Sequence, residues 1–432
     1  MDDTDIDSAA GGRKPGMLAA LRVRDFALLW SGQTISGLGD GIFTVALVIE
    51  TLHVDPHPIS LAYVFAARTI PSVAFSLFGG VMADRVPRRL AMLTSDVVRG
   101  LAVSVIALLV AHNALTLAEL VLLSVVFGTA NAFFSPASMA MVPEVLPPDL
   151  LVPGNALGST SNNLASGLLG PATGGAIVGF IGIAGSFTAD AISFGVSVLS
   201  LALMTPHPGP APTGKSTIEE AREGIRYVRS QRWLVINLVA ASVANFIGLA
   251  PLEVLTALLV RHTLHASALA LGLVFAAGGA AGVVASLIVG RLGTPKHRVQ
   301  VMWFAYGIWG VMIAILAAAP NAVVVGIISG VGVGFVVYGD VLYVSMMQEM
   351  IPENLRGRVF SAAFLLAFVL TPIGTLMGGL AASAIGVRQA LLLSGLLSGI
   401  CALVVFLPGA LPPTTAQSGR PAGDEPEGVA TA

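Results

Sequence analysis

The sequence has little charge, almost no cysteine and few aromatic residues. Only 11% of its 432 residues are charged and 6% are aromatic, whereas an ordinary soluble domain carries roughly 25% charged residues. The single cysteine, Cys401, excludes an internal disulfide and a cysteine-rich metal site. No phosphate-binding loop and no recurring nucleophile–base spacing occur, so the sequence indicates neither an ATP-driven machine nor an enzyme, and it indicates no cofactor. Basic residues form no domain of their own, which argues against a nucleic-acid partner.

Apolar residues, in contrast, make up 55% of the chain. They gather in runs of about 20 residues or more, each long enough to cross a bilayer as an α-helix. We therefore expect an all-α membrane protein with twelve transmembrane helices. The expected spans are 26–50, 60–83, 90–111, 117–142, 156–181, 186–204, 233–260, 267–291, 300–319, 321–347, 359–383 and 388–408.

The basic residues indicate how these spans are oriented. An even number of spans places both termini on one side of the membrane. Of the 22 Lys and Arg residues, Arg68 and Arg99 fall within spans, and only Arg261 and Arg388 lie on the side away from the termini. Loops on the cytoplasmic side carry an excess of Lys and Arg. We therefore expect a multi-pass protein of the bacterial cytoplasmic membrane with both termini in the cytoplasm.

The chain divides into two halves around a polar break. This break starts with four closely spaced prolines and continues with apolar residues at helical intervals, a pattern typical of a stiff spacer followed by an amphipathic helix on the membrane surface. The expected organisation is a disordered tail at 1–16, a six-helix bundle at 17–204, a cytoplasmic linker at 205–232, a second six-helix bundle at 233–408 and a disordered tail at 409–432. The halves look like copies, because the offset that carries Glu144 onto Glu349 also carries Asp40 onto Asn245.

A burst of charge separates the second and third runs. Its marked residues are Gly80, Asp84, Arg85, Arg88 and Arg89. The pattern of glycine, three residues, Asp-Arg and a basic pair resembles the loop between the second and third helices of the major facilitator superfamily. This resemblance implies two parallel repeats that form pseudo-symmetric halves. It also implies that the loop acts as a latch that depends on the conformational state.

Further patterns narrow the resemblance. They include Gly32-Gln33-Thr34-Ile35-Ser36 with Gly39-Asp40, Ala67-Arg68-Thr69-Ile70-Pro71, Asp96-Val97-Val98-Arg99 and Leu355-Arg356-Gly357-Arg358-Val359-Phe360-Ser361. Together they resemble the bacterial exporter branch that holds the enterobactin exporter and the macrolide and multidrug efflux transporters. The resemblance covers roughly residues 25–405, and none of these motifs fixes the substrate.

The fifth run carries a stripe of small residues around a proline. Its members are Ser166, Gly170, Pro171, Gly174 and Gly175. The stripe resembles the element that marks antiporters of the superfamily, with Ser166 in place of the first glycine. Small residues let helices approach closely, and proline kinks a helix. The alternative is an ordinary packing face.

Charged side chains within the spans are the best functional candidates, because an ion at the bilayer centre is costly. Asp40 lies about fifteen residues into the first span, roughly 20 Å deep at ~1.5 Å per residue. The resemblance implies that such an acid binds protons and cationic substrates in turn. The alternative is a permanent ion pair, for example with Arg68. Asn131 and Asn245 are neutral polar candidates for the cavity, or hydrogen-bonding links between helices.

Asp340 in the tenth span is a second candidate. It is flanked by Tyr338 and Tyr343, which would offer stacking area to a cation. A hydrogen bond within the bundle is an equally good interpretation. Glu253 falls near the outer face, where a solvated or interfacial role is expected, and Asp190 stays ambiguous.

Asp96 and Arg99 share one face of the third span. We expect them to join Asp84, Arg85 and Arg88 in a network that locks the cytoplasmic side of the first half. The resemblance implies that the loop aspartate meets the start of the eleventh helix, where the helix dipole favours a negative charge.

The sequence thus predicts a secondary exporter of amphipathic small molecules or drugs. It would work by alternating access as a proton antiporter, with protons, a small molecule and membrane lipid as its partners, and as a monomer. The alternatives are a dedicated siderophore or metabolite exporter, and a flippase for lysophospholipids or other lipids.

Overall fold

The computed structural model describes residues 16–83, 86–206, 217–292, 295–352 and 355–411. Within these ranges all regular secondary structure is helical. Runs of apolar residues give this result because a helix pairs its own backbone groups, which is required where water is absent. Most of the two expected tails, 1–16 and 409–432, lies outside the described residues.

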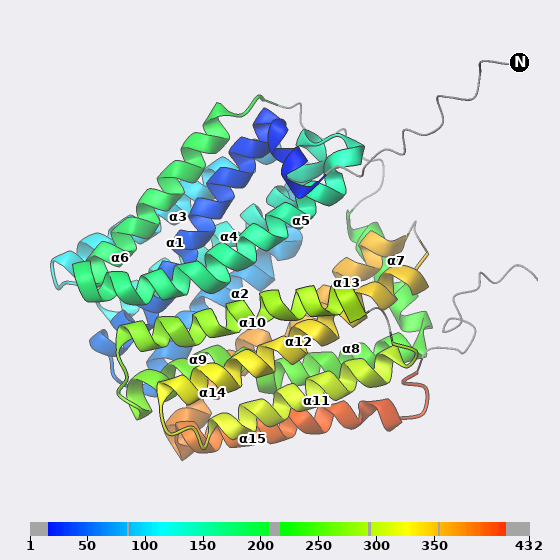
Figure 1. The fold of residues 1–432 in the computed structure, drawn as a ribbon. Helices are drawn as coiled ribbons and strands as arrows, with labels where there is room; N and C mark the ends of the chain where they lie inside the picture. Colours follow the sequence, from blue (N-terminus) through cyan, green and yellow to red (C-terminus); the bar gives the residue numbers. More distant parts are fainter. Residues whose placement is uncertain (1–15, 84–85, 207–216, 293–294, 353–354, 412–432) are drawn as a thin grey trace, which may run out of the picture.

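The N-terminal half is a bundle of long helices joined by short turns (Figure 1). Its helices are η1 (Met17–Arg22), α1 (Arg24–Val54), α2 (Pro58–Ala83), α3 (Arg88–Ala111), α4 (Leu117–Val145), η2 (Pro148–Leu150), α5 (Leu151–Asn162), the π-helical turn η3 (Asn163–Leu169) and α6 (Gly170–Leu203).

The C-terminal half repeats this plan after the short helix α7 (Thr217–Ser230). Its helices are α8 (Arg232–Ala244), the π-helical turn η4 (Asn245–Leu249), α9 (Ala250–Leu258), the π-helical turn η5 (Leu259–Thr263), α10 (Ala268–Leu292), α11 (Arg298–Leu316), α12 (Ala322–Met350), α13 (Arg356–Phe368), α14 (Thr371–Ile385), α15 (Val387–Ile400) and η7 (Cys401–Phe406). Consecutive pieces such as α8–η4–α9–η5, α13–α14 and α15–η7 make up single crossings.

Eleven helical segments in the described ranges are long and apolar enough to cross a membrane. One of them, Pro148–Leu203, has 56 residues, which at ~1.5 Å per residue far exceeds a hydrocarbon core of roughly 30 Å. Gly182 interrupts it with φ 77° and ψ 179°, a conformation that glycine adopts readily. The segment is therefore two crossings joined by a tight turn, which gives the twelve that the sequence predicts. The turn falls where the sequence analysis ended the fifth span.

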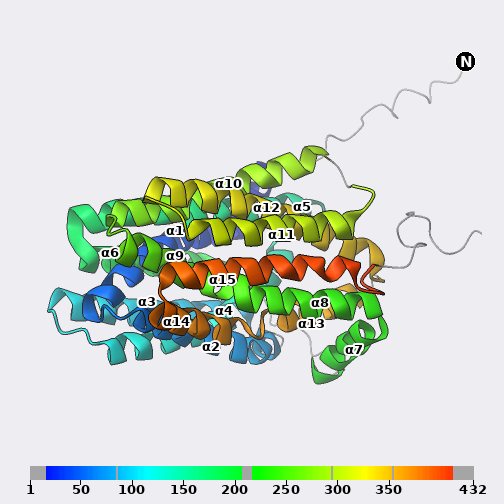
Figure 2. The same cartoon turned by 90° about the horizontal axis from the view of Figure 1, so that it is seen from below.

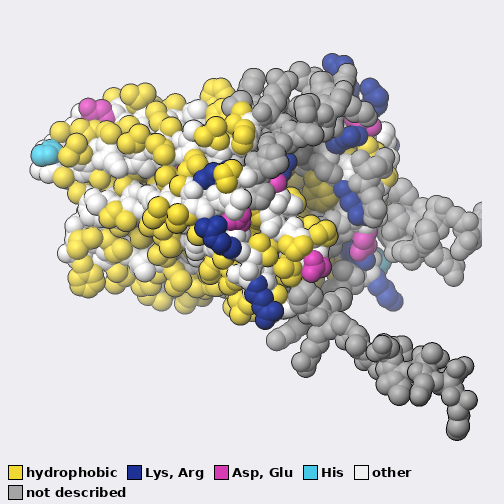
Figure 3. Space-filling model, turned by 90° about the horizontal axis from the view of Figure 1, so that it is seen from above, with side chains coloured by type: hydrophobic (Ala, Val, Ile, Leu, Met, Phe, Trp, Pro, Cys, Tyr) yellow, Lys and Arg dark blue, Asp and Glu magenta, His cyan; other side chains and the backbone are white. Residues whose placement is uncertain are grey.

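The bundle has two distinct ends. We call the end at which α7 lies the linker end, and the end at which residues 55–57 join α1 to α2 the distal end. In Figures 1 and 2 the described helices run lengthwise between these ends. On the face in Figure 3, apolar side chains cover the part away from the linker end, and Lys and Arg side chains lie toward it. This distribution is that of a lipid-facing band with one basic margin.

The apolar cores show how the halves meet. One cluster at the distal end joins residues of both halves, such as Leu47 and Leu61 with Leu255 and Leu271. At the linker end the buried residues form two separate clusters, one in each half, around Met141 and around Trp303. The halves therefore share a core at the distal end and diverge toward the linker end, as the upper and lower groups of helices do in Figure 1.

Close backbone contacts hold the distal seam together. A Cβ added to Gly175 of α6 would lie 2.7 Å from the carbonyl oxygen of Ala268 at the start of α10. On the other side of the molecule, Gly379 of α14 packs against Ala62 and Ile59 of α2. Only glycine allows helices from the two halves to approach this closely.

Candidate functional site

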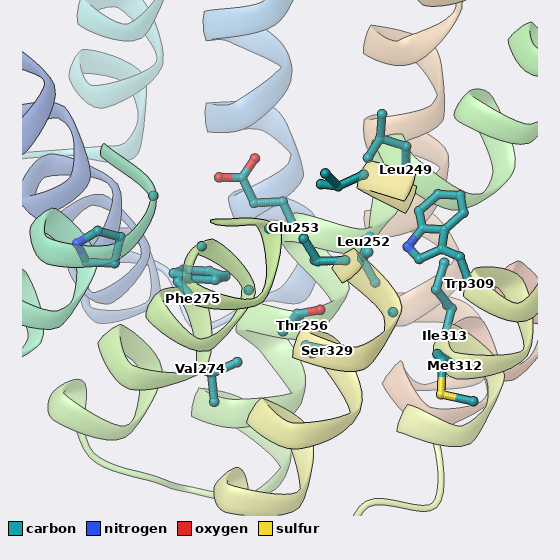
Figure 4. A pocket seen from close by; sticks show the side chains of 18 of the residues that line it. Leu249, Leu252, Glu253, Thr256, Val274, Phe275, Trp309, Met312, Ile313 and Ser329 are labelled. Atoms are coloured by element: carbon teal, nitrogen blue, oxygen red, sulfur yellow. The ribbon is translucent and has the colours of Figure 1, made fainter. Parts of the chain in front are cut away.

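A cavity of about 700 Å³ lies between the halves. The N-terminal half contributes polar and small residues, among them Thr44, Thr69 and Ser166, and the C-terminal half contributes most of the remaining wall. Figure 4 shows the wall made by Leu249, Leu252, Val274, Phe275, Trp309, Met312 and Ile313, with Thr256 and Ser329 as hydroxyl groups. A large, mostly apolar pocket with a few polar groups is typical of a site for an organic small molecule.

Glu253 gives this cavity its charge. Among the described residues that line the cavity, it is the one charged side chain. Its carboxylate accepts no hydrogen bond and forms no ion pair within the described part of the chain, and the side chain is exposed to the cavity. Figure 4 shows it projecting clear of the other labelled side chains. Arg68, on α2 of the opposite half, attracts it electrostatically.

A second group of charges is buried inside the N-terminal half. Asp96 is fully buried and Arg99 is 3% exposed. The two form an ion pair, and Ser197 of α6 donates a hydrogen bond of 2.6 Å to the other carboxylate oxygen of Asp96. The guanidinium of Arg99 lies 4.1 Å from the ring centroid of Phe134 and 4.8 Å from that of Phe194. Such enclosure fixes the pair, because a buried ion is tolerated only with partners.

Asp40 and Asp190 lie in the same group, but neither forms an ion pair with a described residue. The carboxylate of Asp40 makes no hydrogen bond or ion pair with any described residue, although Arg99 and Arg68 attract it electrostatically. Asp190 is fully buried; Ser193 donates 3.2 Å to its Oδ1, and its Oδ2 has no partner in the described structure. Asp190 packs against Gly39, the neighbour of Asp40. Its charge and that of Asp40 repel each other.

Arg68 does not pair directly with Asp40 in this structure. Its guanidinium instead lies 5.8 Å from the ring centroid of Phe43 and 5.3 Å from that of Phe127. These distances suit cation–π attraction. Arg68 therefore stands between two carboxylates that it attracts, Asp40 in its own half and Glu253 across the cavity. We call Asp40, Arg68, Asp96, Arg99 and Asp190 the charged cluster.

The two asparagine candidates bond within the bundle. Asn131 accepts from Arg99 at 3.4 Å and donates to Ser72 at 3.5 Å. Asn245 donates to the backbone oxygen of Ala367 at 3.1 Å, which links η4 to α13. Neither lines the central cavity. These contacts correspond to the helix-linking interpretation of both residues.

Asp340 bonds to a residue that the sequence did not point to. It accepts a hydrogen bond of 2.7 Å from the hydroxyl of Tyr306 on α11. Tyr306 stacks edge-on against Trp303 at 5.6 Å, and Trp303 donates 2.6 Å to Asn237. Tyr338 packs against the linker-end cluster of this half. Asp340 does not line the central cavity either.

The expected latch is described only in part, because Asp84 and Arg85 lie outside the described residues. Gly80 lies in the last turn of α2. Arg88 donates 2.8 Å to the backbone oxygen of Ala140 on α4, and Arg89 donates 2.6 Å to that of Leu201 on α6. Both arginines thus tie the start of α3 to neighbouring helix ends, apart from the Asp96–Arg99 pair.

The C-terminal half has an ion pair at the corresponding position and a further ion pair to the linker helix α7. Arg88 lies 3.6 Å from Glu144, and Arg298 pairs with Glu349 between the corresponding helices. At the start of the eleventh crossing, Arg358 donates 2.7 Å to Glu223 of α7. The linker helix is therefore attached to the C-terminal half.

The small residues of the fifth crossing pack against both halves. Gly170 and Gly174 touch the backbone of α1, whereas Gly175 touches α10. Ser166 lines the cavity. The π-helical turn η3 ends immediately before Gly170-Pro171, and such turns accommodate the carbonyl that a proline leaves unpaired. The helix thus lies between the two halves, beside the cavity.

Sequence reasoning did not single out two acids that the structure places centrally. Glu253 was expected near the outer face, but it projects into the cavity. Asp190 was left ambiguous, but it is fully buried beside Gly39. Two features of the sequence could have pointed to these acids. Glu253 is the one acid in the seventh crossing, and no base lies near Asp190 on the sixth crossing.

Twelve crossings in two similar halves around a central cavity define a polytopic membrane transporter. The chain belongs to the major facilitator superfamily, whose family model matches residues 29–375. This is a family of transporters and not of enzymes.

Curated relatives of this chain include efflux proteins. It is 27% identical over 393 residues to the multidrug efflux pump Tap of Mycolicibacterium fortuitum, which covers 86% of this chain and 93% of that protein. It is 22% identical over 388 residues to macrolide efflux protein A of Streptococcus pyogenes, with 88% and 94% covered.

Solved structures with the same fold include other transporters. A bacterial homologue of the iron transporter ferroportin in an inward-facing state has a TM-score of 0.66 at 17% identity, with 88% of this chain and 98% of that chain covered. The inward open xylose transporter XylE from E. coli has a TM-score of 0.64 at 15% identity, with 88% and 96% covered. At such identities the similarity concerns the fold alone.

Proposed function

We propose that this protein is a secondary active exporter of amphipathic small molecules in the bacterial cytoplasmic membrane. The observation that carries the proposal is the apolar cavity between two halves that share a core at one end and diverge at the other. A site of this kind can open alternately to each side when the halves rock about it. The efflux proteins among the relatives support export as the direction.

The linker end is proposed to face the cytoplasm. Arg88, Arg89, Arg298 and Arg358 all lie at this end, and a basic margin is retained on the cytoplasmic side. The structure then corresponds to a state that receives cargo from the cytoplasm or the inner leaflet. The latch around Asp84 and the stripe around Gly170 are proposed to act on the change between states.

Proton antiport is proposed to run through the charged cluster. Asp96 is neutralised by Arg99, which leaves Asp40 and Asp190 to share the single charge of Arg68. The cluster therefore holds one acid more than bases, and one bound proton makes it neutral. Because an unpaired ion is costly inside a membrane protein, this proton is the candidate for exchange against cargo. Asp40, half-buried and without a direct partner, is proposed as the group that exchanges it.

Transport by purified protein in proteoliposomes tests this proposal. With ethidium as the cargo, an imposed pH gradient should drive uptake into vesicles with the linker end outside. Asp40→Asn and Asp190→Asn should each abolish gradient-driven transport, because the cluster loses its exchangeable proton. The matched control is Asp55→Asn, the same change at a half-buried carboxylate of the distal end, outside the charged cluster. Transport by Asp40→Asn that still follows the pH gradient would contradict the coupling role.

A further inference from the structure

The wall of the central cavity combines an apolar surface with one negative charge. Trp309, Phe275 and Met312 offer flat or adaptable apolar area, and Glu253 is the one charged side chain among the described lining residues. A carboxylate facing an otherwise apolar pocket attracts a cation strongly, because the low dielectric of the wall weakens screening. The hydroxyls of Thr256 and Ser329 can orient a ligand but cannot neutralise a charge.

The carboxylate of Glu253 is also free to bind. No described residue donates a hydrogen bond to it, and it is exposed to the cavity rather than packed in the wall (Figure 4). Buried carboxylates elsewhere in this molecule are held differently: Asp96 is held by Arg99 and Ser197. A purely structural role for Glu253 would require partners of that kind.

One positive charge of the other half lies on a helix that contacts the helix of Glu253, since Arg68 is on α2 and α2 contacts α9. Arg68 attracts Glu253 electrostatically without forming a direct ion pair, and it donates no hydrogen bond to a described residue. Its guanidinium is held against Phe43 and Phe127. A ligand cation placed beside Glu253 would therefore compete with Arg68 for the same carboxylate.

We propose that Glu253 is the anchor of a binding site for ligands that carry one positive charge on an apolar, preferably aromatic, body, and that Arg68 is the cation this ligand displaces. This proposal rests on the proposed export function and names its substrate class. When the cavity is empty, Glu253 and Arg68 attract one another across the two halves. When a ligand is bound, it neutralises Glu253, and Arg68 is left to the carboxylates of its own half.

Binding to the purified full-length protein tests the anchor without any gradient. The probes are tetraphenylphosphonium, a permanent apolar cation, and triphenylphosphine oxide, a neutral molecule with similar rings. Glu253→Gln should weaken tetraphenylphosphonium binding by at least about tenfold, as expected for loss of a charge-assisted contact. It should leave the affinity for triphenylphosphine oxide unchanged. Isothermal titration calorimetry in nanodiscs measures both.

The matched control is Glu119→Gln. Glu119 is an acid at the distal end that closes a capping box with Thr116, and glutamine also fits that box. This variant should bind both probes like the unmodified protein. Unchanged tetraphenylphosphonium affinity in Glu253→Gln would overturn the proposal, and so would an equal loss for both probes, which would indicate a structural role.

Arg68→Gln provides an independent measurement. Removal of the competing cation should tighten tetraphenylphosphonium binding several-fold and leave triphenylphosphine oxide unchanged. Unchanged or weaker tetraphenylphosphonium binding by Arg68→Gln would overturn the role of Arg68. This test remains valid even if Glu253→Gln fails to fold. Because these assays use no gradient, a failure of proton coupling in proteoliposomes would not affect their outcome.

Discussion

The two halves share a backbone plan but differ in what they bury. The N-terminal half holds the five ionisable side chains of the charged cluster, and the rings of Phe127, Phe134 and Phe194 surround Arg99. The C-terminal half holds a mainly neutral chain of contacts, from the buried Asn237 and Trp303 through Tyr306 to the exposed Asp340. Most of the apolar cavity wall also belongs to this half.

One pair of corresponding positions shows the difference directly. The offset between the repeats carries Asp40 onto Asn245. Asp40 has no direct partner and sits among charges, whereas Asn245 is satisfied by the backbone of Ala367. An amide at this position can link helices but cannot exchange a proton. Under the proposed function, one half handles protons and the other accommodates cargo.

The largest loss of stability is expected when one member of the buried Asp96–Arg99 ion pair is removed. Arg99→Leu leaves Asp96 buried without its cation and should destabilise the protein by about 3–5 kcal/mol. Thermal unfolding of the purified protein measures the loss, and Arg229→Leu, at an exposed arginine of α7, is the control. If both variants unfold alike, the ions of the N-terminal half are not a structural core. The double variant Asp96→Asn/Arg99→Gln should recover part of the loss.

A smaller effect is expected in the other half. Tyr306→Phe removes one hydrogen bond to Asp340 and should cost roughly 0.5–1.5 kcal/mol. Tyr63→Phe, at a tyrosine that is 47% exposed, gives the matched control. A loss as large as that of Arg99→Leu would show that the C-terminal half depends on a polar core to the same degree, which would remove the contrast between the halves.

The smallest effect on transport is expected for a change at Asp55, which lies outside the charged cluster and outside the chain of contacts from Asn237 to Asp340. Hydrogen bonds from Ser60 and His57 lower the pKa of Asp55 to about 2. This pKa is below the usual value of 3.8. The ionised carboxylate therefore stabilises the fold fully above about pH 3.8, and this contribution disappears as the pH falls through about 2. Asp55→Asn should therefore leave the pH profile of transport unchanged between about pH 5 and pH 8. A shifted profile would mean that proton exchange is not confined to the charged cluster.

The sequence predicts the crossings well but not the directions of side chains around them. The length of an apolar run gives depth, so the twelve spans and the depth of Asp40 follow from counting. Which way a residue points requires an amphipathic signal. Helices such as α4 and α12 have no distinct polar face, so that signal is absent there. Counting places Glu253 near the outer face of the membrane, and no pattern in the sequence indicates that it lines the cavity.

Hydrogen bonds and ion pairs between residues far apart in the sequence could not be predicted either. Asp340 is flanked in sequence by Tyr338 and Tyr343, yet its hydrogen bond comes from Tyr306 on another helix. Glu223 and Arg358 meet because α7 packs on α13, which no local pattern indicates. The family resemblance supplied the fold, since the charged residues of its motifs, such as Asp40, Asp84 and Asp96, are conspicuous beside long apolar runs.

The glycine contacts at the distal seam also bear on how quickly the halves can part. Where Gly175 meets Ala268 and Gly379 meets Ala62, backbone lies against backbone or a single methyl group. The nearest atoms at the Gly175 contact belong to the backbone, and those at the Gly379 contact belong to Ala62 and Ile59, so few side-chain atoms have to move when the helices separate. We expect separation there to be a rigid rotation whose barrier reflects lost dispersion contacts. Bulkier residues would add a repacking step to every transport cycle.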